Sequence, residues 1–188
     1  MATDSPLAPA FLVALDVLVD PNFARTVVLM LEHDPERGAL GLILNRDTEV
    51  PLAQLCKTQS MRWLGDPRRR VDWGGPVGEE TGWVLLDDAA AAGVDAVKLT
   101  DGVHWARSRE ALQRVIDQPA LRTRVLLGYA GWAAGQLEAE IASGAWLVVP
   151  ASAEIVFDTH TDERWAAAIR SIGVDPALLV ATASHGVN

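Results

Sequence analysis

Two apolar, β-prone runs near the start of the sequence are joined by a tight turn, and this pattern constrains the fold more strongly than any other. The runs cover residues 26–31 and 39–45, and the first is rich in β-branched side chains. Between them, Asp34-Pro35-Glu36-Arg37-Gly38 places proline where a type I turn favours it and glycine where the chain must reverse. The sequence therefore predicts an antiparallel hairpin.

The remaining pattern mixes strands and helices without regular alternation. Strands are predicted at residues 11–19, 82–86, 123–129 and 145–149, and helices at residues 51–57, 108–117, 132–143 and 161–172, with a last short helix from residue 175. Ser108 is the expected N-cap of its helix. This order favours an α+β fold over a doubly wound sheet. At 188 residues, with 49% hydrophobic residues, we expect one domain over residues 1–188 with an ordered core over 9–182.

The charge and the cysteine content of the sequence indicate which binding partners and which cellular compartment to expect. Twenty-five acidic against sixteen basic residues give a net charge of -9, which repels phosphate backbones and anionic membranes. A local exception is the segment 57–70, which we interpret as a solvated loop although it carries Arg68, Arg69 and Arg70. Cys56 is the only cysteine, and Asp16 interrupts the apolar run 7–19. We therefore expect a cytoplasmic protein with no disulfide, no signal peptide, and no nucleic-acid or membrane partner.

The segment GYAGWAAGQLEAE, residues 128–140, combines three glycines with two carboxylates. In a helix over 132–143, ended by Gly144, Glu138 and Glu140 point about 200° apart and cannot act as a paired acid and base. Glu140 borders the expected core face, so we expect it to hold a neighbouring loop or arginine. On another face, Gly135 and Ala139 lie between Trp132 and Gln136. A mid-helix glycine costs about 1 kcal/mol, so we expect another element, a ligand or a second subunit to cover that face.

Other chemistry-bearing residues give weaker signals. The histidines at positions 33, 104, 160 and 185 lack the spacing of zinc ligands, and we expect His33 to be solvated in the hairpin turn. Ser184-His185 lies in the tail, where catalytic geometry is not expected. Cys56 is expected to be a buried, inert thiol. We expect neither a metal nor a cofactor site.

Two turns are better candidates for a ligand pocket. Asn45-Arg46 follows a predicted strand and Gly74-Gly75 precedes Pro76. Both patterns are typical of ordinary turn chemistry, but together they can also form a small anion-binding concavity. The ligand-binding hypothesis needs these residues in one pocket with Trp132 or Gln136. The candidate ligand-binding residues are Asn45, Arg46, Gly74, Gly75, Trp132, Gln136 and Glu140.

Four blocks of the sequence resemble the YqgE/AlgH family of bacterial proteins. They are residues 20–29, residues 32–34 with 38–46, Gly74-Gly75-Pro76-Val77, and residues 128–132 with 136–138, 140–141 and Trp146. The resemblance implies an α+β fold with a bifurcated, mostly antiparallel sheet bent into a pseudo-barrel with flanking helices. The sequence departs from the family pattern at Asp16, Asp47 and Leu86, and many members have histidine at the last of these positions.

Three functions remain open at this point. Because no nucleophile, metal or cofactor motif stands out, we favour a non-enzymatic binding or regulatory module that acts through a protein partner or a small ligand. One alternative is a direct DNA-binding transcriptional regulator, a label that some members of the family carry. Another is a small-molecule enzyme or ligand-binding protein with a site near Asn45-Arg46 and Gly74-Gly75. The sequence does not predict the oligomeric state.

Overall fold

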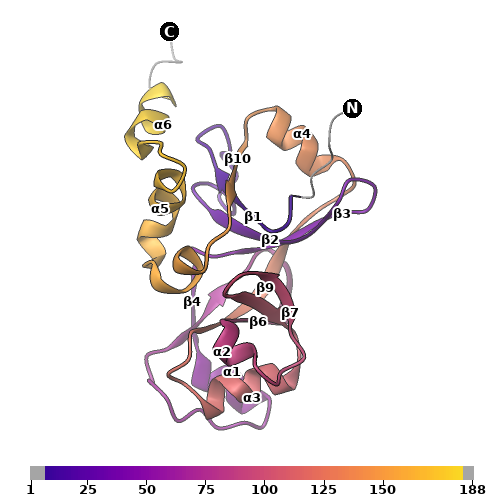
Figure 1. Ribbon diagram of the computed structural model, residues 1–188, viewed down its shortest axis with the longest axis vertical. Helices are drawn as coiled ribbons and strands as arrows, with labels where there is room; N and C mark the ends of the chain where they lie inside the picture. Colours follow the sequence, from indigo (N-terminus) through magenta and orange to yellow (C-terminus); the bar gives the residue numbers. More distant parts are fainter. Residues whose placement is uncertain (1–6, 184–188) are drawn as a thin grey trace.

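The computed structural model describes residues 7–183, and within them ten strands form one branched sheet (Figure 1). The strands are β1 (Ala10–Ala14), β2 (Val27–Asp34), β3 (Gly38–Ile43), β4 (Asp47–Pro51), β5 (Arg70–Trp73), β6 (Val77–Leu86), β7 (Val97–Thr100), β8 (Val103–Ala106), β9 (Thr123–Trp132) and β10 (Trp146–Pro150). The helices are α1 (Leu52–Thr58), α2 (Asp88–Ala91), α3 (Arg109–Asp117), α4 (Gln136–Ala142), η1 (Glu154–Asp158), η2 (Thr161–Glu163), α5 (Arg164–Arg170) and α6 (Pro176–Ala183).

Strand β9 is the point where the sheet branches. The main order is β10-β1-β2-β3-β9-β6-β8-β7, and β5 joins β9 from the side while also pairing with β4. Residues 130–132 of β9 pair with β3, whereas residues 123–127 and Tyr129 pair with β6. The β5–β9 pair is parallel and the other pairs are antiparallel. The expected α+β fold with a bifurcated, mostly antiparallel sheet is confirmed, and the sheet is not closed because β10 and β7 are its ends.

The branching divides the molecule into an upper part, with β1, β2, β3, β10 and α4, and a lower part, with β6, β7, β8 and the helices α1 to α3 (Figure 1). Strand β1 is buried along its whole length because its two faces enter different clusters. Phe11 and Val13 pack toward α5, whereas Leu12 packs toward α4. A third cluster fills the space between the sheet and the helices α1 and α3. The sheet thus carries buried apolar surface on both faces.

Local predictions with clear sequence signals are confirmed. Strands β2 and β3 form the predicted antiparallel hairpin. The hydroxyl of Ser108 accepts a hydrogen bond from the backbone N–H of Ala111 at 3.1 Å, so Ser108 caps α3 as expected. The predicted helices near residues 52 and 176 are present as α1 and α6. Within residues 7–183 no helix is long and apolar enough to cross a membrane.

The prediction for residues 132–143 is wrong at its beginning. Trp132 continues β9 and pairs with Ala39, and α4 begins only at Gln136. Gly135 is therefore not a mid-helix residue: it precedes α4 with φ 72°, in the left-handed region. Ala139 is exposed, and a Cβ added at Gly135 would meet no atom within 4 Å. The face that we expected to be covered is open.

The strand predicted over residues 11–19 ends at Ala14, and four strands were not predicted. The missed strands are β4, β5, β7 and β8. The helix predicted over 161–172 begins as the short 3-10 turn η2 before α5.

Candidate functional site

The structure distributes the candidate ligand-binding residues over three places and does not bring all of them into one pocket. Asn45 and Arg46 follow β3, Gly74 and Gly75 follow β5, and the remaining three join β9 to α4. The cleft that Asn45 and Arg46 line contains neither glycine, nor Trp132 or Gln136. This cleft is therefore not the combined pocket that the sequence suggested.

Hydrogen bonds among the side chains of Trp132, Gln136 and Glu140 link α4 to the sheet. One carboxylate oxygen of Glu140 accepts hydrogen bonds from the indole N–H of Trp132 at 2.9 Å and of Trp146 at 2.8 Å. Its other oxygen accepts from the Gln136 amide at 2.8 Å. Phe23 packs against both indoles, with ring centroids 6.3 and 6.0 Å away. Glu140 thus holds two buried tryptophans, not the loop or arginine that we expected.

The two glycines lie at a close crossing of backbones. The N–H of Gly74 donates to the carbonyl of Leu127 at 2.7 Å, so this amide is not available to an anion. A Cβ added at Gly74 would lie 2.3 Å from the carbonyl oxygen of Gly128, and one at Gly75 would lie 2.2 Å from the carbonyl carbon of Tyr129. Glycine at both positions thus allows β9 to approach closely, and the anion-binding concavity at this turn stays a prediction.

Asn45 and Arg46 fix the backbone of the loop before β2. The amide oxygen of Asn45 accepts from the N–H of Val27 at 2.8 Å, and its amide nitrogen donates to the carbonyl of Arg25 at 2.9 Å. The guanidinium of Arg46 donates to the carbonyl of Ala24 at 2.6 Å. Between these contacts Arg25 has φ 56°, a conformation that costs a residue with a Cβ about 1–2 kcal/mol. Such strain persists only where the surroundings impose it, as they do here.

A cleft of about 340 Å³ lies beside this loop. One wall consists of the loop before β2 together with Asn45 and Arg46, and the other wall consists of η2 and α5. The guanidinium of Arg25 lies 4.2 Å from the ring centroid of Trp165, in cation–π geometry. In the described part of the chain neither Arg25 nor Arg46 forms an ion pair with a carboxylate. The polar and aromatic lining residues are Arg25, Asn45, Arg46, Thr161, Asp162 and Trp165.

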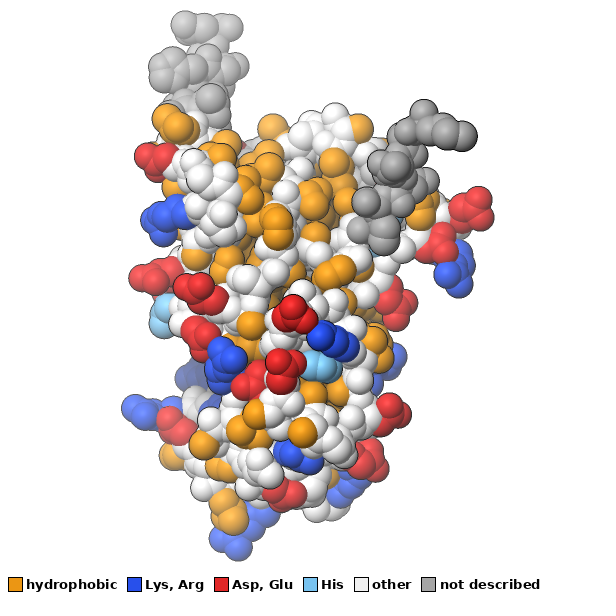
Figure 2. Space-filling view, in the orientation of Figure 1, with side chains coloured by type: hydrophobic (Ala, Val, Ile, Leu, Met, Phe, Trp, Pro, Cys, Tyr) orange, Lys and Arg blue, Asp and Glu red, His pale blue; other side chains and the backbone are white. Residues whose placement is uncertain are grey.

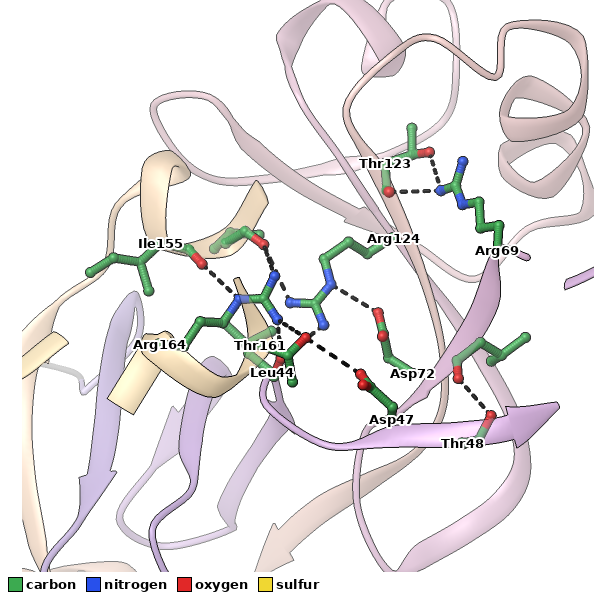
Figure 3. A network of polar contacts seen from close by, with 12 residues as sticks. Leu44, Asp47, Thr48, Arg69, Asp72, Thr123, Arg124, Ile155, Thr161 and Arg164 are labelled. Carbon is green, nitrogen blue, oxygen red and sulfur yellow. Dashed lines mark hydrogen bonds and ion pairs between the residues drawn. The ribbon is translucent and has the colours of Figure 1, made fainter. Parts of the chain in front are cut away.

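A buried arginine network holds the carbonyl of Leu44, the residue directly before Asn45 (Figure 3). The carbonyl of Leu44 accepts from Arg124 at 2.8 Å and from Arg164 at 2.6 Å. These two side chains are only 8% and 6% exposed. Arg124 also donates to the Asp72 carboxylate at 2.8 Å, and Arg164 donates to the carbonyl of Ile155 at 3.0 Å. Leu44 is thereby fixed from β9 and α5 at once.

Burial and neighbouring charges act on Arg164 in opposite directions. Burial and, to a smaller extent, the neighbouring Arg124 cation lower the pKa of Arg164 to about 10, although Asp72 and Asp47 act in the opposite direction. Arg164 therefore stays charged at neutral pH. Its guanidinium donates to carbonyls and to the hydroxyl of Thr161, which lines the cleft. The guanidinium groups of Arg124 and Arg164 thus hold the segment that carries Asn45 and Arg46, through the carbonyl of Leu44.

The basic segment 57–70 is mostly an exposed loop, as we expected, but Trp63 is buried and Arg69 is half-buried. Arg69 donates to the carbonyl and hydroxyl of Thr123 at 2.7 and 2.8 Å, and burial lowers the pKa of Arg69. Arg68 pairs with Asp66 at 3.0 Å, and Arg70 pairs with Glu49. Figure 2 shows acidic and basic side chains interspersed on the face it displays, without a continuous basic stripe.

His33 is not solvated, which corrects another expectation. Its side chain is only 5% exposed, and Nε2 lies 2.7 Å from a carboxylate oxygen of Glu138. Its Nδ1 accepts from the backbone N–H of Leu7 at 3.2 Å. Contacts from α4 and from the chain before β1 thus enclose the side chain.

The other chemical candidates give no second centre within the described residues. Cys56 is fully buried, and burial raises the pKa of its thiol, as expected for an inert cysteine. Among residues 7–183 no three histidine, cysteine or acidic side chains are grouped so that they could hold a metal ion. Ser184 and His185 lie outside the described residues.

Sequence reasoning found Asn45 and Arg46 but missed the residues that complete the cleft and its support. Arg25 and Trp165 line the cleft, and Arg124 and Arg164 support it from below. The one available signal was the presence of arginine within a predicted strand, at Arg124, where an uncompensated charge is costly. Together, these features define an α+β protein with a branched sheet and an arginine-lined cleft beside the branch.

Comparison with known proteins gives the family. The family model described as AlgH-like matches residues 11–177, and the chain belongs to this family. A UPF0301 protein of Myxococcus xanthus is 42% identical over 175 residues, covering 93% of this chain and 95% of that protein. A UPF0301 protein of Ralstonia nicotianae is 40% identical over 187 residues, with 97% of each chain covered. The resemblance seen in the sequence is therefore confirmed.

Two solved structures share the fold. The solution structure of the AlgH protein from Pseudomonas aeruginosa has a TM-score of 0.78 and 33% identity, with 96% of both chains covered. The crystal structure of a protein from Corynebacterium diphtheriae has a TM-score of 0.73 and 26% identity, covering 95% of this chain and 92% of that one. None of these names states a reaction or a ligand, so the site must be interpreted from its own geometry.

Proposed function

We propose that this protein is a non-enzymatic binding module that holds a small anionic molecule in the cleft between the Arg25 loop and α5. The observation that supports the proposal is the pair of guanidinium groups, Arg25 and Arg46, that line one cleft without a carboxylate partner among the described residues. Arginine presents several N–H donors in a planar fork, which suits a phosphate or carboxylate group. The ligand class is therefore a small molecule with such a group.

The lining favours binding over catalysis. It supplies guanidinium groups, the Asn45 amide, the Thr161 hydroxyl and the face of Trp165, but neither a histidine nor a cysteine. Asp162 is the carboxylate of the lining, and it is exposed. A ligand that bridges the Arg25 loop and α5 would connect two segments 120 or more residues apart in sequence, which suits a regulatory module whose state a protein partner reads. The single buried cysteine supports a cytoplasmic location.

Replacing Arg25 by glycine should weaken ligand binding without lowering the stability of the fold. We expect Arg25→Gly to weaken the binding of pyrophosphate by about tenfold or more, because one charge-assisted contact is lost. We also expect the melting temperature to stay the same or rise, because glycine adopts the left-handed backbone of residue 25 without a Cβ penalty. Isothermal titration calorimetry with inorganic phosphate and pyrophosphate measures the first effect, and thermal unfolding followed by circular dichroism measures the second.

Arg68→Gly is the matched control, because Arg68 is an exposed arginine outside the cleft. It should bind pyrophosphate as the wild type does. The proposal is wrong if the wild type binds neither anion, or if both variants bind equally well.

A further inference from the structure

A second pocket, which shares no residue with the arginine cleft, lies in the lower part of the molecule between two helices and the sheet. Its volume is about 350 Å³. Helices α1 and α3 contribute Leu55 and Leu112, and the sheet contributes Val84 from β6 with Val125 and Leu127 from β9. Polar and charged side chains also line the pocket, so that it combines an apolar wall with a polar, exposed rim; they are Gln59, Glu80, Arg107, Ser108 and Arg109.

Strand β6 contributes a glycine, Gly82, to the lining of this pocket, and this residue is exposed. Side chains alternate along a strand, so Gly82 shares a face with Val84, which packs in the cluster beneath α1 and α3. A Cβ added at Gly82 would meet no atom within 4 Å, and its φ is not in the left-handed region. Neither a turn nor a close backbone approach therefore requires glycine at this position. The absence of a side chain at Gly82 leaves open space in the pocket.

An arginine spans the rim of the pocket from α3 to α1. Arg109 lies in the first turn of α3 and donates one guanidinium hydrogen bond to the carbonyl of Gln59, the C-cap of α1, at 2.7 Å. In the described part of the chain Arg109 forms no ion pair. Its remaining donors are thus placed at the edge of the pocket. Arg107 also lines the pocket, but its guanidinium lies over the ring of Trp83, 4.7 Å from the centroid. Glu80, the one acidic lining residue, disfavours a second negative group on the ligand.

We propose that this pocket binds an amphipathic monocarboxylate, with its alkyl chain over Gly82 and its carboxylate at Arg109. If each heavy atom takes about 30 Å³, the cavity holds about ten to twelve of them, which corresponds to a chain of roughly ten carbons. The apolar walls bind the chain through burial from water. Arg109 accounts for the preference for a carboxylate over a neutral or cationic head group.

Decanoate and 1-decanol are the probes, because they share a chain and differ in the head group. The wild type should bind decanoate about tenfold more tightly than decanol by titration calorimetry. In carbon-detected or methyl spectra, the Leu55, Leu112 and Val84 methyl signals should shift on adding decanoate. Arg109→Gln should remove the preference between the probes while decanol affinity remains the same.

Gly82→Leu should abolish the binding of both probes, because the new side chain occupies the open space beside Gly82. Gly131→Leu is the matched control: it is also a strand glycine outside the left-handed region, it is exposed, and it does not line the pocket. It should bind decanoate as the wild type does. If Gly82→Leu does not fold, the Arg109→Gln titration and the wild-type methyl shifts still decide the question.

Several results would overturn the proposal. They are the absence of decanoate binding to the wild type, shifts confined to other methyl groups, undiminished binding to folded Gly82→Leu, or a decanoate preference that survives Arg109→Gln. Pyrophosphate titrations of the same variants should be unchanged, since the arginine cleft shares no residue with this pocket.

Discussion

We expect Arg124→Ala to lower the free energy of unfolding by about 3–5 kcal/mol. Arg124 and Asp72 form an ion pair at 2.8 Å, and their side chains are only 8% and 19% exposed. Removing the arginine leaves a carboxylate in a poorly hydrated site without its partner, which is the costly way to break a buried pair. The carbonyl of Leu44 also loses one of its two donors. Urea denaturation at pH 7, monitored by tryptophan fluorescence, measures the change.

Arg68→Ala is the matched control for this prediction. Arg68 also pairs with an aspartate, Asp66, at 3.0 Å, but their side chains are 88% and 50% exposed. Water and salt screen such a pair, so the urea midpoint should hardly move. If the two variants are equally stable, the Arg124–Asp72 pair does not stabilise the junction between the two parts of the sheet.

The buried pair matters for the cleft as well as for stability. Arg124 and Arg164 come from β9 and α5, and both hold the carbonyl of Leu44, the residue before Asn45. Asn45 and Arg46 in turn hold the loop that contains Arg25. A contiguous set of hydrogen bonds thus leads from the branch point of the sheet to the proposed ligand, and we expect its loss to weaken anion binding.

Local signals explain which parts of the fold could be predicted. The β2–β3 hairpin depends on the turn residues 34–38 and on the apolar runs that flank them. The Ser108 cap depends on one hydroxyl and an N–H three residues later. In both cases the interacting groups are neighbours in the sequence, so the local sequence pattern is enough to predict the structure.

Strands formed by distant pairing could not be predicted in this way. Strand β4 has the sequence DTEVP and lacks an apolar alternation, yet it pairs with β5 some 20 residues later. Trp132 extends β9 because its backbone pairs with Ala39 and its indole is held by Glu140. Tertiary contacts override local propensity at such positions, which is why a helix was wrongly predicted to begin there.

The candidate site likewise combines residues that could be predicted from the sequence with residues that could not. Asn45 and Arg46 were identifiable as polar residues directly after a predicted strand. Their partners were not, since Arg25 lies 20 residues before Asn45 and Trp165 lies 120 residues after it. The left-handed backbone of Arg25 has no sequence signal either, because arginine rarely adopts it. Only the fold shows that these residues line one cleft.

The largest effect after Arg124 is expected at Gly128, in the part of β9 where the sheet branches. Gly128 and Gly135 have the same φ of 72°, so alanine meets a left-handed φ at both positions. A Cβ at Gly128 would lie 2.2 Å from the carbonyl oxygen of Gly75, whereas one at Gly135 would meet no atom within 4 Å. We expect Gly135→Ala to cost about 1 kcal/mol and Gly128→Ala about 2–5 kcal/mol, since overpacking adds to the strain.

Urea denaturation of the two variants side by side isolates the steric part, because the left-handed φ is common to both. Equal losses would contradict the prediction, and would mean that the turn at Gly75 can move away from β9 at little cost. Such movement is opposed by the neighbouring hydrogen bonds, in which Gly74 donates to Leu127 at 2.7 Å and its carbonyl accepts from Ile43 at 2.8 Å. A displaced turn must break these bonds and pull on β3 just before Asn45. We therefore expect any Gly128→Ala protein that folds to lose pyrophosphate binding as well, whereas Gly135→Ala retains it.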